Sequence, residues 1–202
     1  MSVEDQRRFM KSNFPGPPSG PSDQQRGLPA PPLEKPHDEN AQIIDLPKPD
    51  GRVLTQPDIF ACLKNRRSRR QFTKESLSLE EFSFLLWATQ GIDEVIVKGL
   101  ATLRPSPSAG ARHPFETYVA AHHVEGLEPA VYRYLPIKHR LLREFDEPGM
   151  SQRLGKACLG QDFVGDCAAT FIWSCIPYRS EWRYPKGAKV VVQDSGHLCQ
   201  NL

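Results

Sequence analysis

Hydrophobic side chains are sparse in the first quarter of the chain, where prolines are frequent instead. Of the 19 prolines, 11 lie at or before Pro57. The runs Pro15–Pro18 and Pro29–Pro32 exclude helix and disfavour interior strands, because proline fixes φ and has no N–H to donate. Residues 1–54 are therefore predicted to form a proline-rich, extended N-terminal arm.

Two interpretations of this arm remain open. It is either a disordered tail, because it cannot build a core alone, or an arm laid across a partner subunit. In the second case its apolar residues are the candidate anchors: Phe14, Leu28, Ile43, Ile44 and Leu46.

Helical spacing of apolar residues begins after the arm. Thr55-Gln56-Pro57-Asp58 is a candidate start, with Thr55 as the N-cap and apolar residues following at Ile59, Phe60 and Leu63. A second helix is predicted from the capping box Ser78–Glu81 to Gly91. Its apolar face would consist of Leu79, Phe82, Leu85 and Leu86, with Trp87 joining the core.

Strand-like runs dominate the second half. Residues 118–121 and 131–135 are separated by a short segment with glycine and proline, which favours antiparallel pairing over a helical crossover. A helix over 151–163, a buried apolar strand over 168–176 and the start of a helix over 190–202 follow. Residues 55–202 are therefore predicted to be one α+β domain, with a central, mainly antiparallel sheet flanked by helices.

Composition narrows the classes of function. A net charge of +2 does not predict nucleic acid as a partner, since phosphate-backbone binding normally shows as a large basic excess. The five cysteines are odd in number and form no C-x-x-C pair, so no disulfide framework and no metal site are predicted. Without an apolar leader or membrane-spanning run, the protein is expected to be soluble and cytoplasmic.

His122-His123 closes a strand, where alternation predicts one ring inside and one outside.

One local cluster is strongly basic. Arg66-Arg67-Ser68-Arg69-Arg70 places four guanidiniums and a hydroxyl where the first helix is predicted to end. Guanidinium offers paired donors that match phosphate oxygens, and the serine adds another donor. Three interpretations compete on this evidence alone: a solvated basic run, a nucleic-acid or targeting patch, and a clamp for a mononucleotide phosphate.

A second segment, Arg104–Phe115, is rich in small and stiff residues. Such a backbone lets a flat ligand approach closely, and N–H groups at a turn can donate to the heteroatoms of a flavin ring. Arg112 or His113 could add charge there. The alternative is an ordinary proline-rich surface loop.

Three ordered motifs together resemble the nitroreductase superfamily of flavin mononucleotide (FMN)-dependent oxidoreductases. They are R-x-S-x-R-x-F at 66–72, P-S-A-G-A-R-H-P-F-E-x-Y at 107–118 and D-S-G-H-L-C-Q-N-L at 194–202. The segments V-Y-R-Y-L-P at 131–136 and P-Y-R-S-E-W-R-Y at 177–184 are similar to the SagB-type dehydrogenase branch. The match covers Pro57 to Leu202, so the resemblance implies a nitroreductase-like fold for the flavin-binding domain.

The resemblance also implies site residues. The first motif would bind the FMN phosphate through Arg66, Arg67, Ser68 and Arg70, with Arg69 facing solvent. The second would reach the isoalloxazine ring of the neighbouring subunit through Pro107, Ser108, Ala109 and Gly110. Gln161 lies near the position where relatives place an amide against the polar edge of the flavin. The active site would then exist only in a homodimer.

The implied chemistry is hydride transfer at flavin N5 with ping-pong kinetics, in which NADH, NADPH or an organic donor reduces the flavin and a nitroarene or quinone accepts. An alternative is SagB-type azoline oxidation. Members that oxidise azolines carry a Lys-Tyr pair, whereas Arg183 and Tyr184 stand here, and a protonated arginine is a poor base. These two residues are the candidates for catalysis. An alternative of another class is a non-catalytic scaffold that uses the proline-rich arm.

Relatives continue beyond the D-S-G-H-L-C-Q-N-L motif through a flavin-contacting strand and a last segment. The chain is therefore expected to lack a C-terminal part of the domain.

Overall fold

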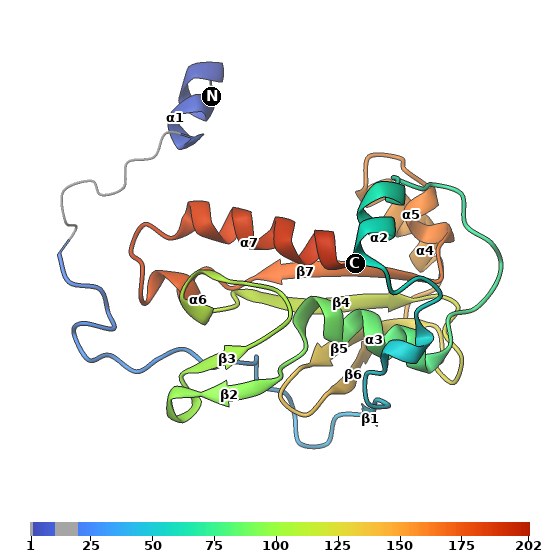
Figure 1. The fold of residues 1–202 in the computed structure, drawn as a ribbon, viewed down its shortest axis with the longest axis horizontal. Coiled ribbons are helices and arrows are strands. Elements are labelled where there is room, and N and C mark those ends of the chain that lie inside the picture. Colours follow the sequence, from blue (N-terminus) through green and yellow to red (C-terminus); the bar gives the residue numbers. More distant parts are fainter. Residues whose placement is uncertain (1, 11–19) are drawn as a thin grey trace.

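The computed structural model describes residues 2–10 and 20–202. Its centre is a five-stranded sheet in the order β1-β6-β5-β4-β7, in which every neighbouring pair is antiparallel. The strands are β1 Ile43–Asp45, β4 Phe115–Ala121, β5 Ala130–Leu135, β6 Arg140–Phe145 and β7 Ala169–Cys175. A separate hairpin joins β2 Glu94–Ile96 to β3 Ala101–Leu103. The predicted fold class, a mainly antiparallel sheet flanked by helices, is confirmed (Figure 1).

Helices cover both faces of this sheet. Helix α3 Leu79–Gln90 packs on one face, where Phe82 and Leu86 are fully buried against side chains of β4, β5 and β6. Helix α7 Ala188–Asn201 contacts α3. Helix α4 Met150–Ala157 lies against the other face of the sheet, to which Tyr118, Val131 and Ile172 contribute side chains. A cavity of about 410 Å³ lies between α4 and these strands. The other helical segments are α1 Val3–Met10, α2 Ile59–Asn65, α5 Phe163–Asp166 and α6 Tyr178–Glu181, with single 3₁₀ turns at Gly51–Val53, Val97–Gly99 and Ala109–Ala111.

The helix signals in the sequence predict both ends of α3 correctly but misplace the start of α2. The Ser78 capping box is present with both of its hydrogen bonds, and the helix ends at Gly91 as predicted. The predicted N-cap Thr55 is wrong, because Asp58 accepts from the Ala61 N–H and caps α2. Trp87 is half-buried and lies outside the core cluster, with its indole N–H donating to Asp93 at 3.1 Å.

Two predictions for the region after β6 need correction. A single helix over 151–163 is wrong, because Leu159 and Gly160 have positive φ values of 61° and 79° and separate α4 from α5. The strand at β7 is confirmed, but its expected burial is wrong. β7 is an edge strand, and its apolar side chains are only partly buried, with Ile172 37% exposed.

The N-terminal arm is tied to its own domain from residue 20 onward. Carbonyl oxygens of the arm accept hydrogen bonds from buried arginines: Pro32 O from Arg179 Nε at 2.9 Å and Pro36 O from Arg133 Nη2 at 3.2 Å. The Leu28 carbonyl accepts from the indole N–H of Trp182 at 3.0 Å. For residues 20–54 the interpretation as a disordered tail is therefore wrong.

The arm also contributes to the sheet. β1 pairs with β6 through Ile43 opposite Leu142, while Ile44 and Leu46 pack against the core. The prediction of extended coil throughout is wrong at α1 and β1, since both elements lie within the arm. The proposed anchor Phe14 lies outside the described residues. Among the residues that are described, no helix has the length and apolar character needed to cross a membrane.

Candidate functional site

The basic segment Arg66–Arg70 follows α2 directly, with Arg66 as the C-cap. All five residues are exposed, and the hydrogen bonds of their guanidiniums go to backbone carbonyls. Arg67 donates to the carbonyls of Lys64 and Arg66 at 3.0 and 2.8 Å, and Arg70 to that of Ser68 at 3.3 Å. Within residues 2–10 and 20–202, none of the four arginines forms an ion pair with a carboxylate. The cluster therefore presents uncompensated positive charge to solvent.

Helix α5 lies beside this segment. The guanidinium of Arg70 sits over the ring of Phe163, 5.7 Å from its centroid. Gln161, two positions before Phe163, is exposed, and its amide donates to the Cys158 carbonyl at 3.0 Å. The structure thus brings the segment that carries Gln161 to the basic cluster, although the two are far apart in sequence.

The second predicted segment, Pro107–Gly110, is fastened to helix α7. Ser108 Oγ donates to the carboxylate of Asp194 at 2.6 Å and accepts from the backbone N–H of His113 at 2.9 Å. The N–H of Ala109 donates to the same carboxylate at 3.4 Å. His197 Nδ1, one turn further along α7, donates to the Pro107 carbonyl at 3.2 Å.

The two candidate catalytic residues meet this loop from the other side. Arg183 Nη1 donates to the Gly110 carbonyl at 3.4 Å. The ring of Tyr184 packs so closely on Gly110 that a Cβ added there would lie 2.7 Å from the phenol oxygen. Gly110 also has a φ of 63°, which favours glycine. The structure therefore joins Pro107–Gly110, Arg183 and Tyr184 into one group.

Of Arg112 and His113, either of which was expected to add charge here, His113 does not. His113 is 4% exposed, its Nε2 lies 3.2 Å from the Thr102 carbonyl, and burial together with Arg104 lowers its pKa to about 3. It is therefore neutral at physiological pH. Arg112 is also buried, donates to the Arg179 carbonyl at 2.8 Å and stacks on Trp182 at 4.9 Å. Both side chains hydrogen-bond to carbonyls outside the loop, so they help to hold it against the rest of the domain.

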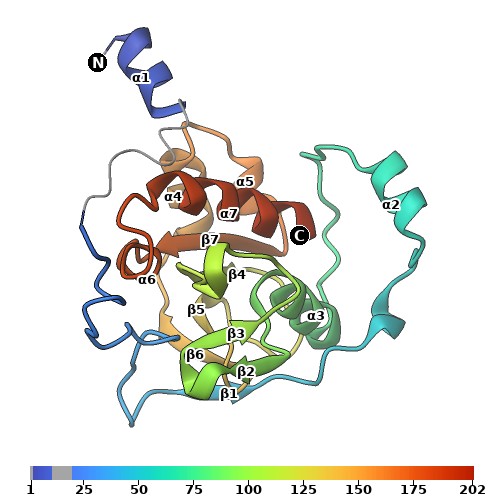
Figure 2. The same ribbon diagram turned by 60° about the vertical axis from the view of Figure 1, so that its left-hand side comes forward.

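The basic cluster and the Pro107–Gly110 loop lie apart within one chain. The first follows α2 and the second touches residues that follow α6, and these two helices are well separated in both Figure 1 and Figure 2. No hydrogen bond or ion pair among the described residues joins the two groups. One chain therefore does not bring both ends of the predicted flavin site together.

Sequence reasoning missed three structural roles. Asp194, in the last motif, received none, although a carboxylate that is 4% exposed needs partners. Arg179 and Trp182 were noted only for their resemblance to one branch, and they hold the N-terminal arm. Arg179 also forms a buried ion pair with Glu116, whose carboxylate accepts from the Lys35 N–H at 3.0 Å. For Asp194 the available signal was helical spacing, since Val191 and Leu198 lie three and four positions away and share its face of the helix.

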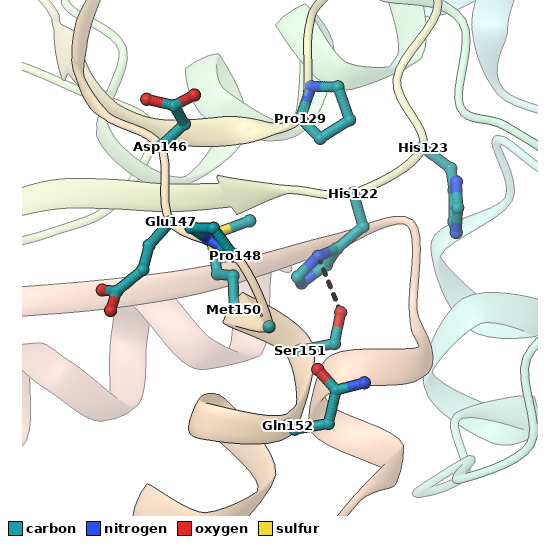
Figure 3. Close-up of a pocket in the computed structure, with 10 residues that line it drawn as sticks. His122, His123, Pro129, Asp146, Glu147, Pro148, Met150, Ser151 and Gln152 are labelled. Carbon is teal, nitrogen blue, oxygen red and sulfur yellow. Dashed lines mark hydrogen bonds between the residues drawn. The ribbon is translucent and has the colours of Figure 1, made fainter.

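A cavity of about 470 Å³ lies away from all of these residues, at the N-terminus of α4 (Figure 3). His122 lines it and is 9% exposed, with Nδ1 3.3 Å from Ser151 Oγ, whereas His123 is exposed. The predicted in-and-out arrangement of the two rings is confirmed. Asp146 and Glu147 at the same cavity pair with arginines, so the described geometry offers no reactive constellation there.

Comparison with known proteins resolves the family. The model of the nitroreductase family matches residues 63–202. This chain belongs to the nitroreductase family. A Methanocaldococcus jannaschii protein described as a nitroreductase, MJ1384, is 32% identical over 160 residues, covering 79% of this chain and 76% of that protein. Membership of this family indicates that the chain is an oxidoreductase.

Two solved structures described as nitroreductases are similar to this family member. The one from Ralstonia eutropha is 28% identical, covers 86% of this chain and 78% of its own, and has a TM-score of 0.59. The one from Anabaena variabilis is 26% identical with a TM-score of 0.66 over 83% of this chain. The chain spans only 34% of the length of the Anabaena variabilis protein.

Proposed function

We propose that this protein is an FMN-dependent oxidoreductase that passes hydride between NADH or NADPH and a small acceptor such as a nitroarene or quinone. The observation that carries the proposal is the uncompensated cluster Arg66–Arg70 within the nitroreductase domain. Guanidiniums paired with carboxylates would have less capacity for an anion, whereas these four are exposed, with backbone carbonyls and, for Arg70, the ring of Phe163 as their contacts.

The residues present fit a phosphate. Several hydrogen-bond donors lie within five consecutive residues, on Arg66, Arg67, Ser68 and Arg70. Fork-shaped guanidiniums match phosphate oxygens. Arg69 is the member assigned to solvent. Gln161, brought to the cluster by the Arg70–Phe163 contact, would present its amide to the polar edge of the flavin.

The loop Pro107–Gly110 fits the ring end of the cofactor. No described hydrogen bond uses the N–H of Gly110, and Tyr184 forms a flat wall beside it. Since the loop and the basic cluster lie apart in one chain, the proposal requires that the loop come from the partner subunit of a homodimer. Helix α2 supports such pairing, because Ile59, Phe60 and Leu63 are 72%, 70% and 63% exposed.

When bound, the flavin supplies hydride transfer at N5. The chain holds its phosphate, presents backbone N–H groups to its ring and limits water with Tyr184. Arg183 donates a hydrogen bond to the Gly110 carbonyl, so it positions the loop, and a guanidinium is unsuited to remove a proton. For this reason reduction driven by NADH or NADPH is favoured over SagB-type azoline oxidation. The scaffold alternative is disfavoured because the arm already uses its carbonyls within its own domain.

The phosphate clamp is tested by titrating the purified protein with FMN and with riboflavin, which lacks the phosphate. Arg66→Gln and Arg70→Gln should weaken FMN binding by about tenfold each, the size expected for loss of a charge-assisted hydrogen bond. Riboflavin affinity should change little, and the control Arg69→Gln should leave both affinities near those of the parent protein. A protein that takes up no FMN would refute the proposal for this chain.

The dimer is tested by light scattering after size-exclusion chromatography. Leu63→Glu places a charge on the exposed apolar face of α2 and should shift the protein toward monomer. Ile137→Glu, at a residue that is 43% exposed in a hairpin, is the matched control. Equal masses for the two variants and the parent would show that α2 lies outside the interface.

A further inference from the structure

The carboxylate of Asp194 is almost completely enclosed between α7 and the loop that precedes β4. It is 4% exposed, and a buried carboxylate is costly unless its oxygens accept hydrogen bonds. Both oxygens do accept: one from Ser108 Oγ at 2.6 Å and the other from the Ala109 N–H at 3.4 Å. Asp194 thus joins the last helix to the middle of the loop.

Ser108 has no hydrogen left to donate to a planar ligand. Its single proton is directed to Asp194, and its oxygen accepts from the His113 N–H at 2.9 Å. The hydroxyl therefore closes the loop on itself. What the loop can offer outward is backbone, especially the N–H of Gly110.

The same stretch of chain adopts a costly conformation. Gly110, Ala111 and His113 have φ values of 63°, 53° and 44°, and non-glycine residues seldom occupy this region. Such a backbone persists only when the surrounding contacts fix it. The hydrogen bonds of Asp194 and Ser108 lie on either side of this stretch, so they are among the contacts that hold the loop in its shape.

We infer that Asp194 is a positioning residue for the flavin site: through Ser108 and Ala109 it fixes the loop whose backbone, rather than the Ser108 side chain, faces the isoalloxazine ring. This inference rests on the proposed function. It assigns to the last motif a role toward the cofactor that acts through the loop.

The test uses the full chain with Asp194→Asn, Ser108→Ala and Ser108→Thr, and Gln193→Ala as the control on the exposed side of α7. FMN affinity is measured by quenching of flavin fluorescence, the environment of bound flavin by visible circular dichroism, and the loop by amide hydrogen exchange over residues 107–113. Asp194→Asn replaces one acceptor oxygen by a donor, so either the Ser108 hydroxyl or the Ala109 N–H loses its acceptor, and FMN binding should weaken by about tenfold. It should also alter the flavin dichroism and speed loop exchange. Ser108→Thr keeps the hydroxyl and should regain most of the affinity that Ser108→Ala loses.

Two results would overturn the inference. The first is unchanged exchange in Asp194→Asn, since the carboxylate would then not hold the loop. The second is faster exchange with parental FMN affinity and dichroism, since the loop would then have no bearing on the flavin. Failure of the proposed function is distinguishable, because the parent protein itself would bind no FMN while the exchange measurement still tests the tether.

Discussion

Gly110 combines two constraints that are separable by mutation. Its φ of 63° disfavours any side chain, and a Cβ would lie 2.7 Å from the phenol oxygen of Tyr184 and 2.9 Å from a ring carbon. Gly126 has a φ of 76° with nothing within 4 Å of the corresponding position. The pair therefore distinguishes backbone strain from crowding.

Gly126→Ala should lower the free energy of unfolding by about 1 kcal/mol, the cost of a left-handed alanine. Gly110→Ala should lose more, because the methyl group also displaces Tyr184, and the excess should shrink in the Tyr184→Ala background. Urea denaturation of the parent, the three single variants and the Gly110→Ala/Tyr184→Ala double variant measures the two contributions. Equal losses at the two glycines would contradict the close packing of Tyr184 on the loop.

His113 provides a pH-dependent term at the same scale. Its pKa falls from 6.5 to about 3 on folding, chiefly through burial and then through Arg104. The folded state therefore binds its proton less readily than the unfolded state, and stability from this group is full above pH 6.5 and declines as the pH falls toward 3.

Replacing His113 by Gln should make the unfolding free energy flatter between pH 6.5 and 3 than in the parent protein. His122 and His139, whose pKa values are also lowered by burial, contribute in the same direction and keep a residual slope in both proteins. The exposed His123→Gln is the control. An identical slope in His113→Gln and the parent would show that His113 is not buried as a neutral ring.

At the scale of elements, the sequence was informative where a structure depends on neighbours in the chain. The Ser78 capping box and the stop at Gly91 are local, and both were readable. The edge position of β7, the pairing of β1 with β6 and the contact of Ser108 with Asp194 depend on residues far apart in sequence, so hydrophobic patterning alone could not supply them. The motifs located the loop, the basic cluster and the last helix α7, but not the hydrogen bonds by which α7 fastens the loop.

The two capped helices α2 and α3 should respond differently to loss of their caps. Ser78→Ala removes the cap of a helix whose apolar face forms the core, and should cost about 1 kcal/mol of global stability. Asp58→Ala removes an equivalent cap from α2, which carries an exposed apolar face, so it should lower local helicity with little effect on global unfolding. Chemical denaturation and amide exchange over residues 59–65 distinguish the two, and equal global losses would mean that α2 is packed.

At the scale of the whole molecule, we expect residues 20–54 of the arm to fold together with the domain. Removing residues 2–47 would withdraw the carbonyl partners of Arg133, Arg179 and Trp182 and the strand beside β6. Because each buried group left unpaired costs about 1–3 kcal/mol, we expect this deletion to destabilise the domain severely. Deleting residues 2–10 is the control, since no described hydrogen bond joins α1 to the rest of the chain. Thermal unfolding measures both, and a parental melting temperature without residues 2–47 would refute the unity of arm and domain.

The pairing of Ile43 with Leu142 also bears on the order of events during synthesis. β1 leaves the ribosome early, yet within the described residues it pairs with β6 alone, and β6 is made after α3, β4 and β5. The closing of so long a loop is entropically costly and late, so the meander of β4, β5 and β6 should assemble first. Before β1 pairs with β6, the apolar residues Ile43 and Ile44 are exposed and β6 is an open edge of the sheet. A second nascent chain can pair with such an edge.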